Sequence, residues 1–125
     1  MIDHVSVGVA DLNRAARFYE VTLAALGLSR LVTRRATVGF GKTYPEFWVN
    51  ERKDMPQPSA NSGMHVCLRA RSKEIVDSFF AAALREGGAS DGPPGMRPEY
   101  NDKYYAAFVR DLDGNRIEVV TFLAA

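Results

Sequence analysis

The spacing of hydrophobic and polar positions changes from a strand-like to a helix-like period and back along the first half of the chain. From Ile2 to Val9, valines alternate with polar or small residues, which is typical of a strand with one buried face. Apolar residues then recur at helical spacing between Leu12 and Leu26, with Asp11 as a candidate N-cap and Gly27 as a stop. Three short apolar runs follow, which we interpret as strands: Leu28–Val32, Thr37–Phe40 and Glu46–Val49.

The same series restarts after a segment without periodicity. Residues 50–62 hold charges, prolines and small polar groups, a composition typical of a linker. Alternation resumes over Met64–Ala70, and an apolar helical stripe lies between Ser72, a candidate cap, and Gly87. A segment with three prolines, Asp91–Lys103, predicts a long loop. Two final strands are expected over Tyr104–Arg110 and Arg116–Phe122, joined by a hairpin turn at Asp111–Asn115.

The two halves form an internal repeat. His4 lies as far before Gly27 as His65 lies before Gly88, and the two halves are offset by 61 residues. A strand–helix–three-strand unit cannot close its own sheet, so two copies are expected to share one core. We therefore predict an α+β fold of two tandem βαβββ modules in one domain, 1–125. Module one spans about 1–50, the linker about 51–62 and module two about 63–125.

Composition excludes several classes of protein. The net charge of +1, mixed in sign along the chain, provides no field that would attract nucleic acid or an anionic membrane. No window has the 18 or more apolar residues that a membrane span requires. The single cysteine forbids an internal disulfide, and the N-terminus lacks the pattern of a signal peptide. A cytoplasmic protein without nucleic-acid or membrane partners is expected.

Candidate metal ligands fall on one face of the predicted sheet. If the valines of the first strand face the helices, His4 and Ser6 face away, because side chains alternate along a strand. By the same argument His65 and Cys67 point away from the core in the second module, and Glu118 does so in the last strand. Two imidazoles and a carboxylate form the ligand set of open catalytic metal sites. Taken singly, each is more often an ordinary solvated side chain, but the two histidines occupy equivalent places in the repeat.

Several motifs resemble the vicinal-oxygen-chelate superfamily, which includes glyoxalases, bleomycin-resistance proteins and extradiol dioxygenases. The resemblance covers nearly the whole chain. It rests on His4–Leu12, Arg17–Tyr19, Leu26–Leu28, Gly63–Val66 and, most specifically, Ala107–Glu118. It implies an open, cup-shaped mixed sheet with the helices on its outer face. It also implies a small-molecule ligand and a homodimer.

The resemblance places His4, His65 and Glu118 on the family's metal-ligand positions. It implies a divalent ion (Zn, Mn, Fe, Co or Ni) that chelates neighbouring oxygens of a small molecule. True glyoxalase I would need a fourth ligand, but Trp48 stands there and cannot ligate, while Glu46 has only a weak claim. We therefore expect a glyoxalase-like lyase, isomerase or transferase. An extradiol-type dioxygenase and a metal-free, bleomycin-resistance-like sequestering protein are the alternatives, the last without any cofactor.

Other polar and aromatic residues are candidates for contacts with the substrate. Ser6 and Cys67 share the faces of the two histidines, although a solvated serine and an inert cysteine are the commoner roles. Trp48 occupies a cup-facing place in module one. Tyr100 and Tyr104 lie near the long loop, which is expected either to cover the cup or simply to pack.

Overall fold

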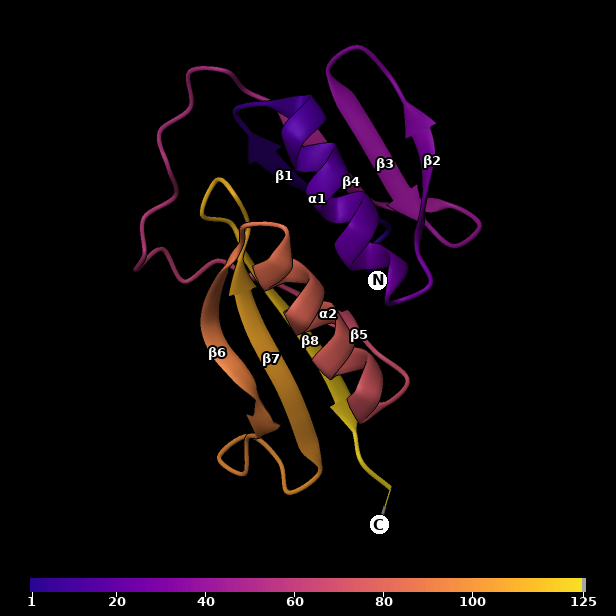
Figure 1. The fold of residues 1–125 in the computed structure, drawn as a ribbon, viewed down its shortest axis with the longest axis vertical. Coiled ribbons are helices and arrows are strands. Elements are labelled where there is room, and N and C mark those ends of the chain that lie inside the picture. The colour runs from indigo at the N-terminus through magenta and orange to yellow at the C-terminus, as the bar shows by residue number, and fades with distance from the viewer. Residues whose placement is uncertain (125) are drawn as a thin grey trace.

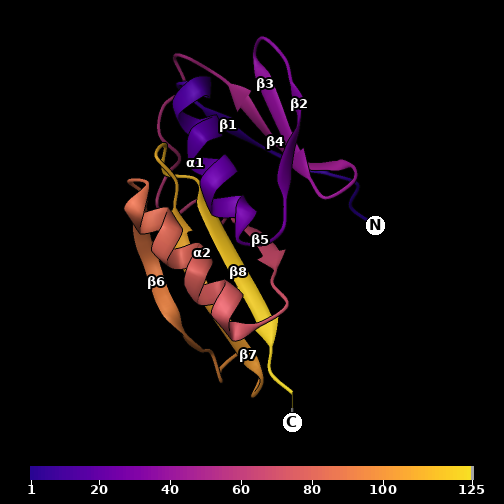
Figure 2. The same ribbon diagram turned by 45° about the vertical axis from the view of Figure 1, so that its right-hand side comes forward.

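The computed structural model, which describes residues 1–124, contains two helices and eight strands arranged as two βαβββ modules (Figures 1 and 2). Both modules of the prediction are confirmed. Module one consists of β1 (Val5–Val9), α1 (Leu12–Ala24), β2 (Ser29–Thr33), β3 (Thr37–Gly41) and β4 (Pro45–Glu51). Module two consists of β5 (Val66–Arg69), α2 (Lys73–Arg85), β6 (Ala89–Met96), β7 (Tyr104–Arg110) and β8 (Arg116–Phe122).

Each module forms its own four-stranded mixed sheet. The strand order is β1-β4-β3-β2 in the first sheet and β5-β8-β7-β6 in the second, so the two sheets have the same topology. The first and last strands of each module pair in parallel, and the other pairs are antiparallel. β1 and β5 are therefore edge strands, each with one side that carries no strand of its own sheet.

Local sequence signals set the helix ends. The carboxylate of Asp11 accepts a hydrogen bond from the backbone N–H of Arg14, and the hydroxyl of Ser72 accepts one from Ile75. Both are side-chain N-caps that satisfy a free amide of the first turn. Beyond α1 the chain turns at Gly27, whose φ of 78° is a conformation that glycine adopts without strain.

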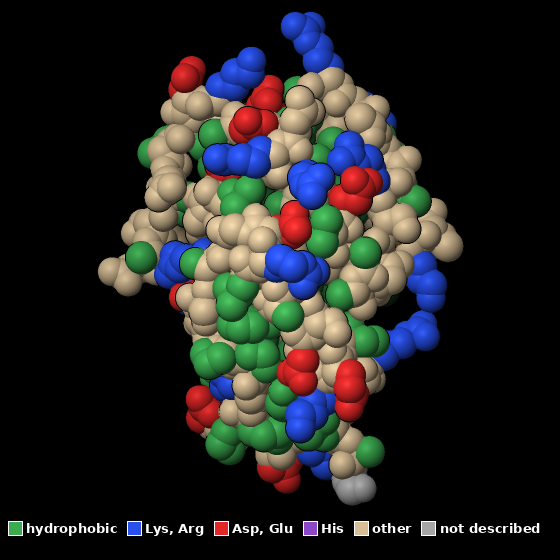
Figure 3. Space-filling view, in the orientation of Figure 1, with side chains coloured by type: hydrophobic (Ala, Val, Ile, Leu, Met, Phe, Trp, Pro, Cys, Tyr) green, Lys and Arg blue, Asp and Glu red, His purple; other side chains and the backbone are tan. Residues whose placement is uncertain are grey.

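Both helices cover the same side of the molecule, and they pack against each other there (Figure 1). The largest fully buried side chains lie beneath them, among them Phe18 and Tyr19 of α1, Phe79 of α2 and Ile117 of β8. The helix-side surface mixes acidic and basic groups, and no histidine is visible on it (Figure 3). The side chains that alternate away from the core thus emerge on the opposite face of each sheet.

The structure corrects three details of the sequence prediction. The segment Asp91–Lys103 is not a loop throughout, because β6 occupies its first half. This strand is an edge strand with register shifts, which is where Pro93 and Pro94 are tolerated. Met64, expected in the core, is 73% exposed because β5 begins only at Val66. Likewise β1 begins at Val5 rather than Ile2.

The connection between the modules runs through residues 52–65. Of the helices that the structure describes in residues 1–124, neither is long and apolar enough to cross a membrane.

Candidate functional site

His65 and Glu118 meet on the open face of module two. Nε2 of His65 lies 2.9 Å from Oε1 of Glu118, although the two residues are 53 positions apart. The pairing of β5 with β8, which sets Cys67 opposite Glu118, produces this contact. The Glu118 side chain is only 4% exposed, whereas that of His65 is 39% exposed. A buried carboxylate thus stands beneath an accessible imidazole.

The second oxygen of this carboxylate is also held. The hydroxyl of Tyr104 in β7 donates a hydrogen bond to Oε2 of Glu118. Burial, followed by this bond to Glu118, raises the pKa of Tyr104, so the hydroxyl remains a donor at neutral pH. Burial, and then the charge of Glu118, also raises the pKa of Cys67 to about 12. The thiolate, which is the nucleophilic form of cysteine, is therefore disfavoured at Cys67.

Aromatic rings surround this pair. The ring of Phe108 lies 6.2 Å from that of His65, and the rings of Tyr100 and Tyr104 meet edge to face at 5.2 Å. The ring of Phe122 lies 5.3 Å from that of Tyr104. Tyr100, a predicted substrate contact, therefore packs against Tyr104, which in turn contacts Glu118.

His4 lies on the open face of module one. Its Nδ1 is 2.7 Å from Oδ1 of Asp3, and the hydroxyl of Tyr44 donates to the same carboxylate at 3.1 Å. With Nδ1–H donating to Asp3, Nε2 of His4 makes no hydrogen bond within residues 1–124. A carboxylate that orients an imidazole in this way is the usual support of a histidine metal ligand.

A cavity of about 330 Å³ opens beside His4. Ser6, Trp48, Arg34 and Asn50 are among the residues that line it. The register of the parallel pair sets Ser6 opposite Trp48. The two residues predicted as substrate contacts in module one are thus neighbours in one cavity.

The indole of Trp48 packs against the backbone of Gly39. A Cβ atom added to Gly39, its partner in β3, would lie 2.8 Å from the indole ring. The guanidinium of Arg34 lies 5.3 Å from the centre of the same ring. The absence of a side chain at Gly39 therefore leaves the space that the indole occupies. The sequence alone indicates no role for Arg34 or Gly39.

The structure brings only two of the three predicted metal ligands together. A smaller cavity of about 160 Å³ is lined by Ser6 and Gly8 of β1 and by His65, whereas His4 lines the larger one. Within residues 1–124, no three His, Cys, Asp or Glu side chains lie close enough to hold one metal ion. Glu46, the weak fourth candidate, lines a different cavity of about 690 Å³, beside Lys42 and Arg71.

The residues present nonetheless fit a divalent ion in part. Nε2 of His65 and a carboxylate oxygen converge, both on an open face, and imidazole with carboxylate suits Zn, Fe or Mn. The free Nε2 of His4 is the same type of donor, at the equivalent place of the other module. The donor types of a divalent-metal site are therefore present, but one chain divides them between two faces.

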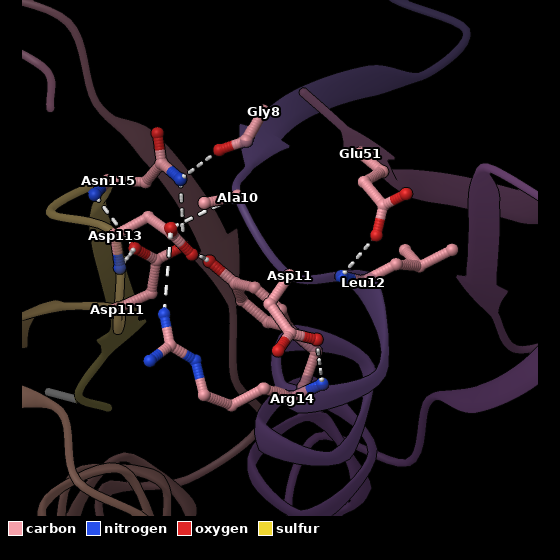
Figure 4. Close-up of polar contacts among 10 residues, drawn as sticks. Gly8, Ala10, Asp11, Leu12, Arg14, Glu51, Asp111, Asp113 and Asn115 are labelled. Carbon is pink, nitrogen blue, oxygen red and sulfur yellow. Dashed lines mark hydrogen bonds and ion pairs between the residues drawn. The ribbon is translucent and has the colours of Figure 1, made fainter. Parts of the chain in front are cut away.

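A second polar cluster joins the modules (Figure 4). It lies in the β7–β8 turn, where the sequence predicts only a hairpin turn. Oδ1 of Asp113 accepts the backbone N–H of Ala10 at 3.0 Å, and the amide of Asn115 donates to the carbonyl of Gly8 at 2.8 Å. Both contacts tie the turn of module two to the end of β1.

The centre of this cluster is Asp111, which is 6% exposed. Its carboxylate accepts the hydroxyl of Tyr19 from α1, and also backbone and side-chain N–H groups of Asn115 and the backbone N–H of Asp113. Burial raises the pKa of Asp111, against these hydrogen bonds, which lower it. Burial likewise raises the pKa of Tyr19, with Asp111 as the next cause. The cluster positions the modules and is not open to a substrate.

Comparison with known proteins identifies the family. A family model described as the Glyoxalase/Bleomycin resistance protein/Dioxygenase superfamily matches residues 1–119. The chain belongs to this superfamily. The resemblance seen in the motifs is thereby confirmed. No protein among the curated sequences matches the chain.

Solved structures of superfamily members share this arrangement of two modules. A glyoxalase/bleomycin resistance protein from Albidiferax ferrireducens T118 is 31% identical, with a TM-score of 0.83 over 94% of this chain and 96% of that one. A possible glyoxalase from Bacillus cereus is 24% identical, with a TM-score of 0.69 over 97% and 98%. A family enzyme from Burkholderia phytofirmans PsJN is 15% identical, with a TM-score of 0.74 over 98% of each chain. The last two show the fold alone.

Proposed function

We propose that this superfamily member is a glyoxalase-like, metal-dependent lyase, isomerase or transferase that acts on a small oxygen-rich molecule. The observation that carries the proposal is the contact of His65 with the buried, Tyr104-bound carboxylate of Glu118 on an open face. The proposed ligands are His65 and Glu118 of one chain and His4 of a second chain. A bound divalent ion would act there as a Lewis acid towards neighbouring oxygens of the substrate.

The edge strands support a site shared between two chains. His4 immediately precedes β1 and His65 immediately precedes β5, and both strands are edges of their sheets. Exposed edges favour pairing with another chain. Within one chain, Ser6 of β1 and His65 line one small cavity, but His4 does not line it. A homodimer that brings the start of β1 in one chain to the start of β5 in the other would bring His4 to His65. We propose such a homodimer in the cytoplasm, with no nucleic-acid or membrane partner.

The protein's own residues have distinct roles in this proposal. Tyr104 holds one oxygen of Glu118 and so directs the other oxygen towards His65. Asp3 holds Nδ1 of His4 and so directs Nε2 outward. Both are positioning residues for the proposed ligands, and Tyr104 is in addition a proposed contact of the substrate. Ser6 and Trp48 line the cavity beside His4 and would contact the substrate.

The first test is metal stoichiometry. Protein purified without chelator and then loaded in turn with Zn, Mn, Fe, Co and Ni should retain about one ion per chain. His4→Ala, His65→Ala and Glu118→Ala should each lose it with unchanged circular dichroism, because none of the three removes apolar packing. Glu99→Ala, an exposed carboxylate on the β6–β7 connection, is the control and should retain the ion.

Mixing two inactive variants tests whether the site is shared. In a heterodimer of His4→Ala and His65→Ala chains, one shared site loses two ligands and the other retains all three. Refolded mixtures should therefore recover metal that neither variant binds alone. If each site belonged to one chain, every chain would carry a defect and no metal would return. A monomeric mass in sedimentation at micromolar concentration would also contradict the proposal.

A metal-free binding protein is the second candidate. It is favoured by the division of His4 from His65 and Glu118, and by a cavity that presents Trp48 and Tyr44. In that case the wild type stays free of metal with all five ions, and His4→Ala changes no metal content. Ligands entering the cavity would still change the fluorescence of Trp48.

A further inference from the structure

We infer that the cavity beside Trp48 selects organic anions with a flat, apolar body, and that Arg34 recognises the anionic group. The inference rests on the proposed function, since it names the substrate class of the same site. An aromatic carboxylate is the simplest molecule of this class. Arg34 is thereby assigned as a specificity-determining residue.

The charge of the cavity lining supports this assignment. None of the seven residues that line the cavity is acidic, and Arg34 is cationic. The carboxylate of Asp3, which contacts the lining residues His4 and Tyr44, is occupied by those two contacts. Five arginines pair with carboxylates: Arg14, Arg17, Arg30, Arg110 and Arg116. Within residues 1–124 Arg34, like Arg69 and Arg97, has no carboxylate partner. An arginine without a counter-ion, at the mouth of a concave site, is suited to bind an anion.

Asn50 supplies a second donor. The hydroxyl of Thr37 lies 2.5 Å from Oδ1 of Asn50 and 3.1 Å from the carbonyl oxygen of Val49, and its single hydrogen can be donated to one of them. When that hydrogen is donated to Oδ1 of Asn50, the NH₂ group is the part of the Asn50 amide that is left to donate to a ligand. Arg34 and Asn50 both line this cavity, and together they offer N–H donors to the oxygens of one carboxylate.

Trp48 supplies the flat surface. One face of the indole is covered by Gly39, and Arg34 lies over the ring at 5.3 Å. A guanidinium held over an indole loses little freedom when it binds a carboxylate, so the pair is prepared for its ligand. An aromatic body attached to that carboxylate would contact the edge of the indole, because Gly39 covers one face and Arg34 lies over the ring.

The same pairing recurs on the open face of module two. The guanidinium of Arg69 lies 4.6 Å from the ring centre of Phe122, and that of Arg97 lies 5.4 Å from the ring centre of Phe108. Neither arginine has a carboxylate partner within the described residues, although Arg97 donates to backbone carbonyls. In the proposed dimer, an anion bound at Arg34 would therefore meet a second face that is also cationic and aromatic.

Fluorescence of the single tryptophan reads the cavity directly. We choose benzoate and benzamide as probes, because they share size and shape and differ in charge. In chelator-treated protein, benzoate should quench Trp48 saturably and bind at least about tenfold more tightly than benzamide, as expected for a charge-assisted bidentate pair. Absence of saturable quenching, or equal affinity for the two probes, would overturn the inference.

Two neighbouring arginines provide the matched variants. Arg34→Met should lower the affinity for benzoate by about tenfold or more and remove the preference over benzamide, because a charged bidentate donor is lost. Arg35→Met removes the same charge one residue away, outside the cavity lining, and should leave both affinities unchanged. An equal loss in the two variants would mean that only the general charge of the protein attracts benzoate, which contradicts the inference.

Metal stoichiometry separates this inference from the proposed function. If the protein binds no metal but Arg34→Met alone abolishes the preference for benzoate, the enzyme proposal fails and the inference stands. If metal binds as proposed but Arg34→Met leaves the preference intact, the inference fails alone. Thermal unfolding of both arginine variants checks that folding is unchanged, which is expected because both side chains are exposed.

Discussion

The hydroxyl of Tyr19 in α1 donates a 2.5 Å hydrogen bond to Oδ2 of Asp111, 92 positions away in the β7–β8 turn. Both residues are buried, Tyr19 completely. This bond joins the two modules beneath α1. It is therefore a stability element, and its removal by Tyr19→Phe deletes no residue of the proposed site.

Tyr19→Phe should destabilise the fold by about 1–3 kcal/mol, because it leaves an oxygen of a buried carboxylate with one donor fewer. Urea denaturation, followed by circular dichroism, measures this change. Tyr44→Phe is the matched control, since Tyr44 also donates to a carboxylate but is 54% exposed. Equal losses in the two variants would contradict the special role of the buried pair.

The raised pKa of Asp111 predicts a pH dependence of stability. Burial raises this pKa, so the folded state binds the proton more tightly than the unfolded state does. The unfolding free energy contributed by Asp111 should then increase as the pH falls from the raised pKa towards 3.8, and decrease as the pH rises through it.

Other carboxylates titrate in the same range, so the measurement is a difference. The unfolding free energy of the wild type minus that of Asp111→Asn should grow as the pH is lowered through this window. The asparagine has no proton to gain, so the shared titrations cancel. Asp91→Asn removes a paired carboxylate in β6 and serves as the comparison. A difference for Asp111→Asn that shrinks on acidification would show that the hydrogen bonds outweigh burial at Asp111.

The repeat and the periodicity were sufficient to predict both modules, because alternation and helical spacing are local properties of the chain. β6 was missed for a local reason as well. Pro93 and Pro94 disfavour a central strand, and only the sheet order shows that β6 is an edge.

The candidate site was predictable residue by residue but not as an assembly. The face of each of His65 and Glu118 follows from alternation, and the structure brings the two together. The separation of His4 depends on how the modules pack, which is fixed by Tyr19, Asp111 and the turn around them. Nothing in the sequence near Arg34 indicates a role, since it follows β2 directly, as many surface arginines follow a strand. Only the structure shows that its guanidinium lies over the ring of Trp48.

Phe79 tests the assignment of the helix faces. Phe79→Ala should cost about 3–5 kcal/mol, because Phe79 is fully buried beneath α2 and its removal leaves a cavity. Leu84→Ala, on the same helix, is the control and should cost much less, since Leu84 is 40% exposed. A loss below about 1 kcal/mol for Phe79→Ala would mean that the buried face of α2 is assigned wrongly.

Cys67 tests the electrostatics around Glu118. The Cys67 residue is exposed, yet burial of its thiol and the nearby charge of Glu118 raise its pKa to about 12. Since the thiolate is the reactive form, iodoacetamide at pH 8 should modify Cys67 much more slowly in the folded protein than in urea. Glu118→Gln removes the negative charge and should accelerate the reaction, whereas Glu99→Gln, on the β6–β7 connection, should not. The rate is read by mass spectrometry of the alkylated chain. If both variants react at the wild-type rate, burial alone protects the thiol and the charge of Glu118 has no part in it.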